Sequence, residues 1–451
     1  MSSIFDILLK YNISVPRYTS YPPVPMWHSM PSVEDWINNL KQNFEKIQQQ
    51  GISIYIHLPF CEQLCTYCGC NKRITKNHQV EDPYIDSVLK EWKFYQDIFG
   101  KINIREIHLG GGTPTFFSPK NLEQLISGLF KDNTVANDFQ GSVEIHPHFS
   151  KLEHLDVLRA LYFDRISIGV QDFDKKVQIA INRTQEYSEV KRLTEYARKL
   201  GYKSVNYDLV YGLPFQSREG LSDTIQKVIE LKPDRIAFYS YAHVPWIKAS
   251  QRKFTEKDLP TTEEKIQLYL MGREMFMNNG YEDVGMDHFA LPEDELFMAR
   301  RNKTLHRNFM GYTVQHTDTL IALGVSSISD SGDMYVQNSK EVEEYQTLVQ
   351  KQIPVLKGHK VSDDEKKMRK HLLNLLCYFE TTLEDEQDIL VSMMKDNPMW
   401  DDVVKNNLAV IENNKIKATD LGKLLIRNVC YALDKPSQKA HSEKPLFSKA
   451  I

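Results

Sequence analysis

The sequence predicts an α/β fold: a partial (β/α)6 barrel with an N-terminal extension and a smaller, mainly helical C-terminal domain. Two observations predict it. Short β-branched runs alternate with longer segments of helical periodicity, and each distinctive motif follows one of these runs. Strands joined by helices must run parallel, and the ligands of such barrels lie at the carboxyl ends of the strands.

Six strand-like runs carry this prediction. They are ISIYIH (52–57), IREIHLG (104–110), SVEIHP (142–147), RISIGV (165–170), SVNYDLV (204–210) and RIAFYSY (235–241). A chain of 451 residues exceeds the usual size of one hydrophobic core, so further units are expected on both sides of the barrel. We predict an N-terminal extension (1–50) with one helix over 33–49, the barrel domain (51–355), a helical domain (356–435) and a polar tail (436–451).

The composition is that of a folded protein without a membrane span. Hydrophobic residues make up 41% and charged residues 26%, and the net charge of -4 argues against a protein whose main partner is nucleic acid. The N-terminus lacks the basic region and cleavage site of a signal peptide, and no window approaches the roughly 18 apolar residues of a spanning helix. A cytoplasmic location is therefore expected.

Four of the six cysteines fall between residues 61 and 70, which indicates metal chemistry rather than disulfides. Cys61, Cys65 and Cys68 form a Cys-x3-Cys-x2-Cys loop directly after the first strand. Three thiolates on one loop can hold three irons of a [4Fe-4S] cluster and leave the fourth iron open to a ligand. The alternative is a structural zinc site completed by Cys70, although such sites usually draw a second ligand pair from a distant hairpin.

Polar and glycine-rich positions recur at the ends of the later strands. The second strand ends in Gly110-Gly111-Gly112-Thr113-Pro114, where glycines let backbone approach a ligand. Glu144 ends the third strand, and further polar residues extend the lining from the fourth and fifth strands, namely Gln171, Asn182, Arg183 and Asp208. These positions predict one continuous pocket, although each residue alone could be a cap or a member of an ion pair.

With these motifs the sequence resembles the oxygen-independent coproporphyrinogen III oxidases (coproporphyrinogen dehydrogenases) of the radical S-adenosylmethionine (SAM) superfamily, over nearly its whole length. The segments that carry the resemblance are VPRYTSYP (15–22), YIHLPFCEQLCTYCGCNK (55–72), GGGTPT (110–115), GVQDF (169–173), DLVYGLPFQ (208–216), YAHVP (241–245), GMDHFALPEDEL (285–296), LHRNFMGYT (305–313) and LGKLLIRNVC (421–430). One departure is His146-Pro147-His148, where the family often has Asp-Pro-Arg.

The resemblance implies an oxidoreductase that converts two propionate side chains of coproporphyrinogen III to vinyl groups and gives protoporphyrinogen IX. It implies one [4Fe-4S] cluster on Cys61, Cys65 and Cys68, and two SAM molecules. Tyr55, Gly111 and Glu144 would contact the first SAM, and the second, or the space between the two, would be lined by Tyr67, Gly112, Thr113, Gln171, Arg183, Asp208, Ala242 and Ile328. For the carboxylates of the substrate we consider the cations Arg17, His288, His306 and Arg307.

Two relatives on the same core are alternatives: a haem-binding, chaperone-like protein and a haem-degrading methyltransferase. The chaperone-like branch typically lacks the PRYTSYP segment and the cysteine at position 70, and this chain has both. A low-potential electron donor such as flavodoxin or ferredoxin is the partner that the resemblance implies, with an electron acceptor that the sequence does not identify. No sequence pattern demands an oligomer, and a monomer is compatible with it.

Overall fold

A computed structural model describes residues 4–246, 248–385, 387–443, 447 and 449. Its centre is a twelve-stranded sheet in the order β16-β15-β14-β13-β1-β4-β5-β6-β7-β8-β10-β9. The six predicted strands are present and pair in parallel, each with the next in the chain. They are β1 (Ile52–Leu58), β4 (Asn103–Gly111), β5 (Thr134–Ile145), β6 (Phe163–Gln171), β7 (Ser204–Tyr211) and β8 (Arg235–Ser240). The predicted partial barrel is therefore confirmed.

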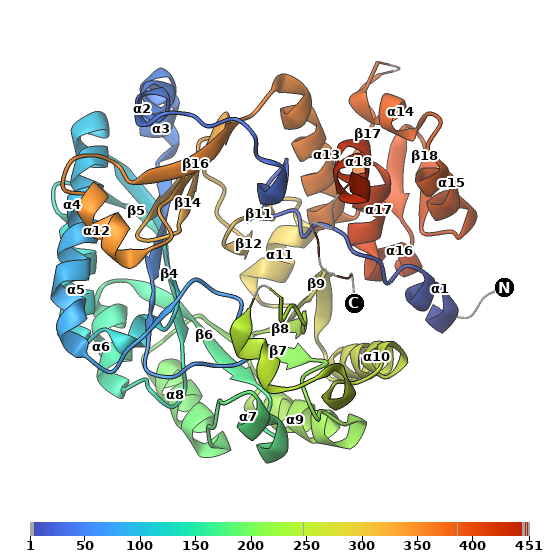
Figure 1. Ribbon diagram of the computed structural model, residues 1–451, viewed down its shortest axis with the longest axis horizontal. Coiled ribbons are helices and arrows are strands. Elements are labelled where there is room, and N and C mark those ends of the chain that lie inside the picture. Colours follow the sequence, from blue (N-terminus) through green and yellow to red (C-terminus); the bar gives the residue numbers. More distant parts are fainter. Residues whose placement is uncertain (1–3, 247, 386, 444–446, 448, 450–451) are drawn as a thin grey trace.

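Helices follow the strands and form an arc outside them (Figure 1). They are α4 (Glu81–Phe99), α5 (Pro119–Phe130), α6 (Leu152–Ala160), α7 (Lys175–Ala180), α8 (Tyr187–Lys199), α9 (Arg218–Leu231) and α10 (Thr262–Asn278). This alternation is the reason that the strands run parallel, because each helix returns the chain to the same end of the sheet.

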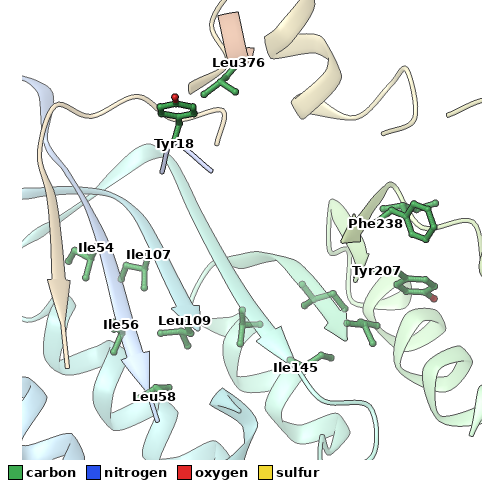
Figure 2. Close-up of a cluster of buried hydrophobic side chains, with 14 of the residues drawn as sticks. Tyr18, Ile54, Ile56, Leu58, Ile107, Leu109, Ile145, Tyr207, Phe238 and Leu376 are labelled. Atoms are coloured by element: carbon green, nitrogen blue, oxygen red, sulfur yellow. The ribbon is translucent and has the colours of Figure 1, made fainter. Parts of the chain in front are cut away.

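Alternate residues of each barrel strand point to opposite faces, which separates a core from a lumen. Ile54 of β1 pairs with Ile107 of β4, and Ile56 with Leu109. These side chains are fully buried in the main core, and Figure 2 shows them side by side. Each such burial contributes about 2 kcal/mol to folding. The intervening positions face the lumen.

Beyond the predicted strands, the sheet continues on both sides. On the β1 side lie β13 (Leu320–Leu323), β14 (Ile328–Asp330), β15 (Met334–Asn338) and β16 (Val355–Lys360); on the β8 side lie β10 (His288–Ala290) and β9 (Glu282–Gly285). A separate hairpin joins β11 (His306–Asn308) to β12 (Gly311–Thr313).

The N-terminal extension contains two helices where the sequence predicts one. Helices α2 (Val33–Gln42) and α3 (Phe44–Gln50) meet at Asn43, whose backbone leaves the helical region. Ser32 and Asp35 form a reciprocal capping box that fixes the start of α2. A further helix, α1 (Ile4–Lys10), precedes them.

The C-terminal region is mainly helical, as predicted, but it also contains a three-stranded sheet. Its helices are α13 (Asp363–Tyr378), α14 (Ile389–Met394), α15 (Pro398–Lys405), α16 (Asp420–Leu424), α17 (Ile426–Ala432) and α18 (Lys435–Glu443). The strands β17 (Glu380–Thr382), β19 (Lys415–Ala418) and β18 (Ala409–Glu412) pair in that order. Helix α18 occupies the first part of the expected tail, and residues 444–446, 448, 450 and 451 lie outside the described residues.

The N-terminal segment runs along the barrel to this C-terminal region (Figure 1). The hydroxyl groups of Tyr18 and Tyr21 both donate hydrogen bonds to the carboxylate of Asp434, at 3.0 and 3.1 Å. Arg427 Nε donates to the carbonyl oxygen of Pro16 at 3.1 Å. The two ends of the chain therefore hold each other in place.

Among the described helices, none is both long and apolar enough to span a membrane. The residue bounds of the predicted domains stay a prediction.

A buried carboxyl group on α4 gives the fold a pH dependence. Glu91 accepts hydrogen bonds from Gly324 N at 2.9 Å, Tyr345 Oη at 2.7 Å and Asn338 Nδ2 at 2.7 Å. Burial raises the pKa of Glu91 to about 7 in spite of these bonds. Protonated Glu91 stabilises the fold in acid. This contribution to the free energy of unfolding, about 3 kcal/mol, is lost as the pH rises through about 7.

We therefore expect the unfolding free energy to fall between pH 5 and 8 by more in the unaltered chain than in Glu91→Gln, as measured by urea unfolding at several pH values. Glu91→Gln is expected to have a lower unfolding free energy of its own, since its amide nitrogen faces the Asn338 amide. Only the difference in pH dependence between the two proteins therefore tests the assignment. Equal pH dependence in the two proteins would count against it.

Candidate active site

One cavity of about 820 Å³ fills the lumen from the carboxyl ends of the strands toward their amino ends. The thiols of Cys61, Cys65, Cys68 and Cys70 lie on its wall. So do most of the residues implied as SAM contacts, namely Tyr67, Gly111, Gly112, Thr113, Glu144, Gln171, Arg183, Asp208 and Ala242. Tyr55 and Ile328 are not among the described residues that line it.

The cysteine loop is held by hydrogen bonds to neighbouring segments and needs no bound ion for its path. Thr66 N donates to the carbonyl oxygen of Ile181 at 2.9 Å, and Asn182 Nδ2 donates to that of Leu64 at 2.8 Å. On the other side, Gln251 Nε2 donates to the carbonyl oxygen of Tyr67 at 3.3 Å. The loop is therefore preorganised by α7 and by the segment after β8.

Each thiol has a different environment. Burial raises the pKa of Cys61 to about 11, although Thr113 Oγ1 donates to its sulfur at 3.3 Å. A hydrogen bond with the Cys70 thiol, helped by Lys72, lowers the pKa of Cys68 to about 5. Arg183 Nη1 donates to the Cys65 sulfur at 3.7 Å. Of these sulfurs, that of Cys68 is therefore the one whose surroundings favour the thiolate, which is the form that binds metal.

The glycine motif packs tightly against the end of β1. Gly111 has a φ of +113°, and a Cβ there would lie 2.9 Å from the His57 ring. A Cβ at Gly112 would lie 2.5 Å from the carbonyl oxygen of Pro59. From the sequence we expect glycine at these positions because a ligand approaches the backbone there. In the structure, protein atoms are the groups that leave no room for a side chain.

Glu144 is oriented from the lumen side of β4. Its Oε1 lies 3.3 Å from His108 Nε2, and His108 Nδ1 lies 2.6 Å from Ser142 Oγ. Tyr55 stacks on the His108 ring with centroids 5.8 Å apart, so it supports Glu144 from behind the cavity wall. Burial alone would raise the pKa of Glu144, but the hydrogen bond and charge of His108 hold it below its usual value.

The surroundings of Asp208 raise its pKa, whereas those of Glu144 lower the pKa of that group. Burial, and after it the charge of Glu144, raise the pKa of Asp208 to about 6. Ser167 Oγ and Asn206 Nδ2 donate to its two oxygens at 2.8 and 2.9 Å. Two carboxyl groups in one cavity thus have pKa values pushed apart, a pattern typical of active sites.

Gln171 and Arg183 complete the wall of the cavity near the carboxyl ends of the strands, which we call its upper half. Gln171 ends β6 with a φ of +63°, in the left-handed region that few non-glycine residues adopt. Arg183 is buried, and its Nη2 donates to the carbonyl oxygen of Gly169 at 2.6 Å. The guanidinium therefore lies between the cysteine loop and β6.

Of the residues that line the polar lower half of the cavity, toward the amino ends of the strands, the sequence analysis named His288 and missed most of the others. The lining of this half includes Glu106, His108, Gln140, Ser142, Arg165, Ser204, Asn206, Arg235 and His288. Most of these residues occupy alternate positions of the barrel strands, as in Ser204, Asn206 and Asp208 of β7. Polar residues at every second position of strands in a parallel barrel were a readable signal for a polar lumen.

Comparisons with known proteins place the chain in a family. A model of the radical SAM superfamily matches residues 55–228. The chain is 37% identical to the oxygen-independent coproporphyrinogen III oxidase of Escherichia coli over 99% of this chain and 98% of that protein. The enzyme of the same name from Pseudomonas aeruginosa is also 37% identical, with the same two shares covered.

A solved structure agrees with these sequence matches. Coproporphyrinogen III oxidase (HemN) from Escherichia coli, described as a radical SAM enzyme, superimposes with a TM-score of 0.88. The match has 34% sequence identity and covers 95% of this chain and 98% of that chain. This chain belongs to the family of oxygen-independent coproporphyrinogen III oxidases, within the radical SAM superfamily.

Proposed function

We propose that this chain removes CO2, one hydrogen atom and one electron from each of two propionate side chains of coproporphyrinogen III. Two vinyl groups result, and the product is protoporphyrinogen IX. The observation that carries the proposal is one cavity that joins a three-thiol loop to a polar lumen in a chain of this family. The haem-binding and haem-degrading alternatives are not supported by the relatives that match nearly the whole chain.

The residues present fit a [4Fe-4S] cluster held by Cys61, Cys65 and Cys68. Their sulfurs share one cavity wall, yet among the described residues no three His, Cys, Asp or Glu side chains are close enough to hold a single metal ion. Three thiolates on one loop can hold three irons of a cubane and leave the fourth open, whereas structural zinc sites usually draw a second ligand pair from a distant hairpin. When bound, the cluster and SAM supply the one-electron chemistry that removes a hydrogen atom from the substrate.

The chain itself binds and orients the reactants. Glu144, ionised and oriented by His108, is suited to accept hydrogen bonds from the ammonium group of SAM. Arg183 supplies a buried positive charge beside Cys65, and Asp208 and Gln171 offer hydrogen-bonding groups next to it. We assign two SAM molecules to this upper cavity, lined by the residues that the resemblance implies.

A low-potential protein such as flavodoxin or ferredoxin is the electron donor that this reaction needs, and the cytoplasm is the compartment that supplies it. Tyr55 remains a predicted contact of the first SAM, and Ile328 a predicted contact of the second SAM or of the space between the two. Tyr55 would act through its stacking on His108, and Ile328 lies on β14.

Replacing Glu144 by glutamine should weaken SAM use while the cluster is retained. The amide keeps the shape of the side chain but loses the charge that binds an ammonium group. We expect the KM for SAM to rise about tenfold, since a hydrogen bond to a charged group is worth about 1.5–3 kcal/mol. The measurement is 5'-deoxyadenosine formation against SAM concentration, with iron content as the control; an unchanged KM would remove Glu144 from the site.

The test of the function is an anaerobic assay with reconstituted protein, SAM, a low-potential reductant and coproporphyrinogen III. Porphyrin products and 5'-deoxyadenosine are followed together. Protoporphyrinogen formed with about one 5'-deoxyadenosine per CO2 would establish the proposal. 5'-Deoxyadenosine without a decarboxylated product would move the chain to a relative with another tetrapyrrole substrate.

A further inference from the structure

The lower cavity contains a group of arginines that the SAM contacts leave unexplained. Arg165 and Arg235 begin β6 and β8 on the lumen side, and His288 lies on β10 next to them. Arg165 Nε, Arg235 Nη2 and His288 Nδ1 are buried and have no hydrogen-bond partner among the described residues. Three unused polar groups therefore line the same end of the cavity.

Both of these arginines are fixed by carboxylates at the start of α11 (Glu295–Arg301). Arg165 forms an ion pair with Glu295, and Arg235 Nε donates to Asp294 Oδ1 at 2.7 Å. Nearby, Arg17 Nη1 lies 3.2 Å from Asp287 Oδ2. Each of these guanidinium groups thus has its charge balanced.

Arg307 on β11 is different, because it is buried without a counter-ion. Only 5% of its surface is exposed, and its Nε and Nη1 have no hydrogen-bond partner. No carboxylate of the described residues forms an ion pair with it. Its guanidinium stacks 4.7 Å from the ring centre of Tyr312, which lines the cavity. The Tyr312 ring in turn packs edge-on against His288 at 5.3 Å.

A buried charge without a partner opposes folding. The charge of Arg307 also reaches His288, since burial and then this charge lower the pKa of His288 to about 3. The imidazole is therefore neutral, and it can contribute to an anion site only as a hydrogen-bond donor, for which its unpartnered Nδ1 is available. An anionic ligand that pairs with the Arg307 guanidinium would explain why this charge is buried.

We propose that Arg165, Arg235 and His288, which line the cavity, form a subsite for carboxylates of the tetrapyrrole that do not react. Arg307, which stacks on the lining residue Tyr312 and is not itself among the described lining residues, supplies the uncompensated positive charge of this subsite. The inference rests on the proposed function. Arg165 and Gln171 lie six residues apart on β6, about 20 Å for extended backbone. A carboxylate held at Arg165 is therefore remote from the cysteine loop, so the subsite fixes the far rim of the macrocycle and turns the reacting side chain toward SAM.

Arg307→Met tests the proposal. We expect the KM for coproporphyrinogen III to rise at least tenfold, while the KM for SAM and the iron content stay unchanged. We also expect the melting temperature of the free protein to stay equal or to rise, because the substitution removes an uncompensated charge. Arg307→Gln, which loses the charge but keeps polar atoms, should show the same rise in KM.

The matched control is Arg369→Met. Arg369 is another arginine stacked on a tyrosine, 5.3 Å from the ring centre of Tyr335, but it forms an ion pair with Asp330. Its loss should lower the melting temperature and leave both KM values unchanged. A structural role for Arg307 would make Arg307→Met behave in the same way.

Binding of the unreactive coproporphyrin III, followed by fluorescence, separates the possible failures. The unaltered protein should bind it at least tenfold more tightly than Arg307→Met does, and the tetramethyl ester should abolish that difference. Equal binding of the free acid by both proteins, or a rise only in the KM for SAM, would overturn the subsite. If the unaltered protein neither binds coproporphyrin nor converts coproporphyrinogen, the proposed function itself fails.

Discussion

Replacing Cys65 by serine is expected to remove the iron–sulfur cluster and reduce turnover to background while the fold survives. A serine hydroxyl is a poor ligand for iron, so one corner of the three-thiol site is lost. The loop keeps its path because its anchors are Thr66 N, Asn182 and Gln251, none of which involves the sulfur. Iron and sulfide content after anaerobic reconstitution, with circular dichroism for the fold, would measure the effect.

Cys70→Ser is the matched control for this experiment. Cys70 lies on the same loop, and it is exposed where Cys65 is buried. We expect this variant to retain four irons and four sulfides per chain. Full iron and turnover in Cys65→Ser would contradict the ligand assignment, and loss of iron in Cys70→Ser would make Cys70 a ligand.

Replacing Arg183 by methionine is expected to raise the KM for SAM about ten- to a hundredfold without loss of iron. The guanidinium is buried, hydrogen-bonded to the carbonyl oxygen of Gly169 and next to the Cys65 sulfur. Methionine fills a similar volume but offers neither charge nor N–H donors, and a charged hydrogen bond is worth about 1.5–3 kcal/mol. The KM for SAM and the iron content, measured on the same preparation, test this expectation.

Arg183→Lys serves as the conservative comparison, since lysine keeps the charge and should restore part of the affinity. If Arg183→Met lost its iron, the residue would belong to the support of the cluster and not to the binding of SAM. An unchanged KM would place SAM elsewhere in the cavity.

The upper half of the active site could be predicted because its residues stand in short, continuous motifs. The six barrel strands are marked by runs such as RISIGV, whose β-branched residues favour strands. Cys61, Gly112, Glu144 and Asp208 follow or end these runs, and parallel strands bring such positions to one edge. Local sequence and tertiary arrangement therefore agree there.

The lower half was not predicted from motifs, because its one signal, polar residues at every second position of a strand, does not form a continuous motif. Arg165 and Arg235 look like ordinary charged residues at the start of a strand, and their partners Glu295 and Asp294 come much later in the chain. Only the folded sheet shows that their side chains point into the lumen. The edge strands β13 to β16 were missed for a related reason, since strand propensity depends on the neighbours that a strand packs against.

The hydrogen bonds from Tyr18 and Tyr21 to Asp434, which join the two ends of the chain, affect the order in which the protein can fold. Tyr21 and Asp434, which share a hydrogen bond, are separated by 413 positions in the sequence. A ribosome delivers the amino end first, and domains fold from that end as they emerge. Residues 15–22 therefore cannot reach their final position until nearly the entire polypeptide has been synthesised. Arg17, which lies in this segment, lines the cavity, so the wall of the active site is completed only after the C-terminal region has been made.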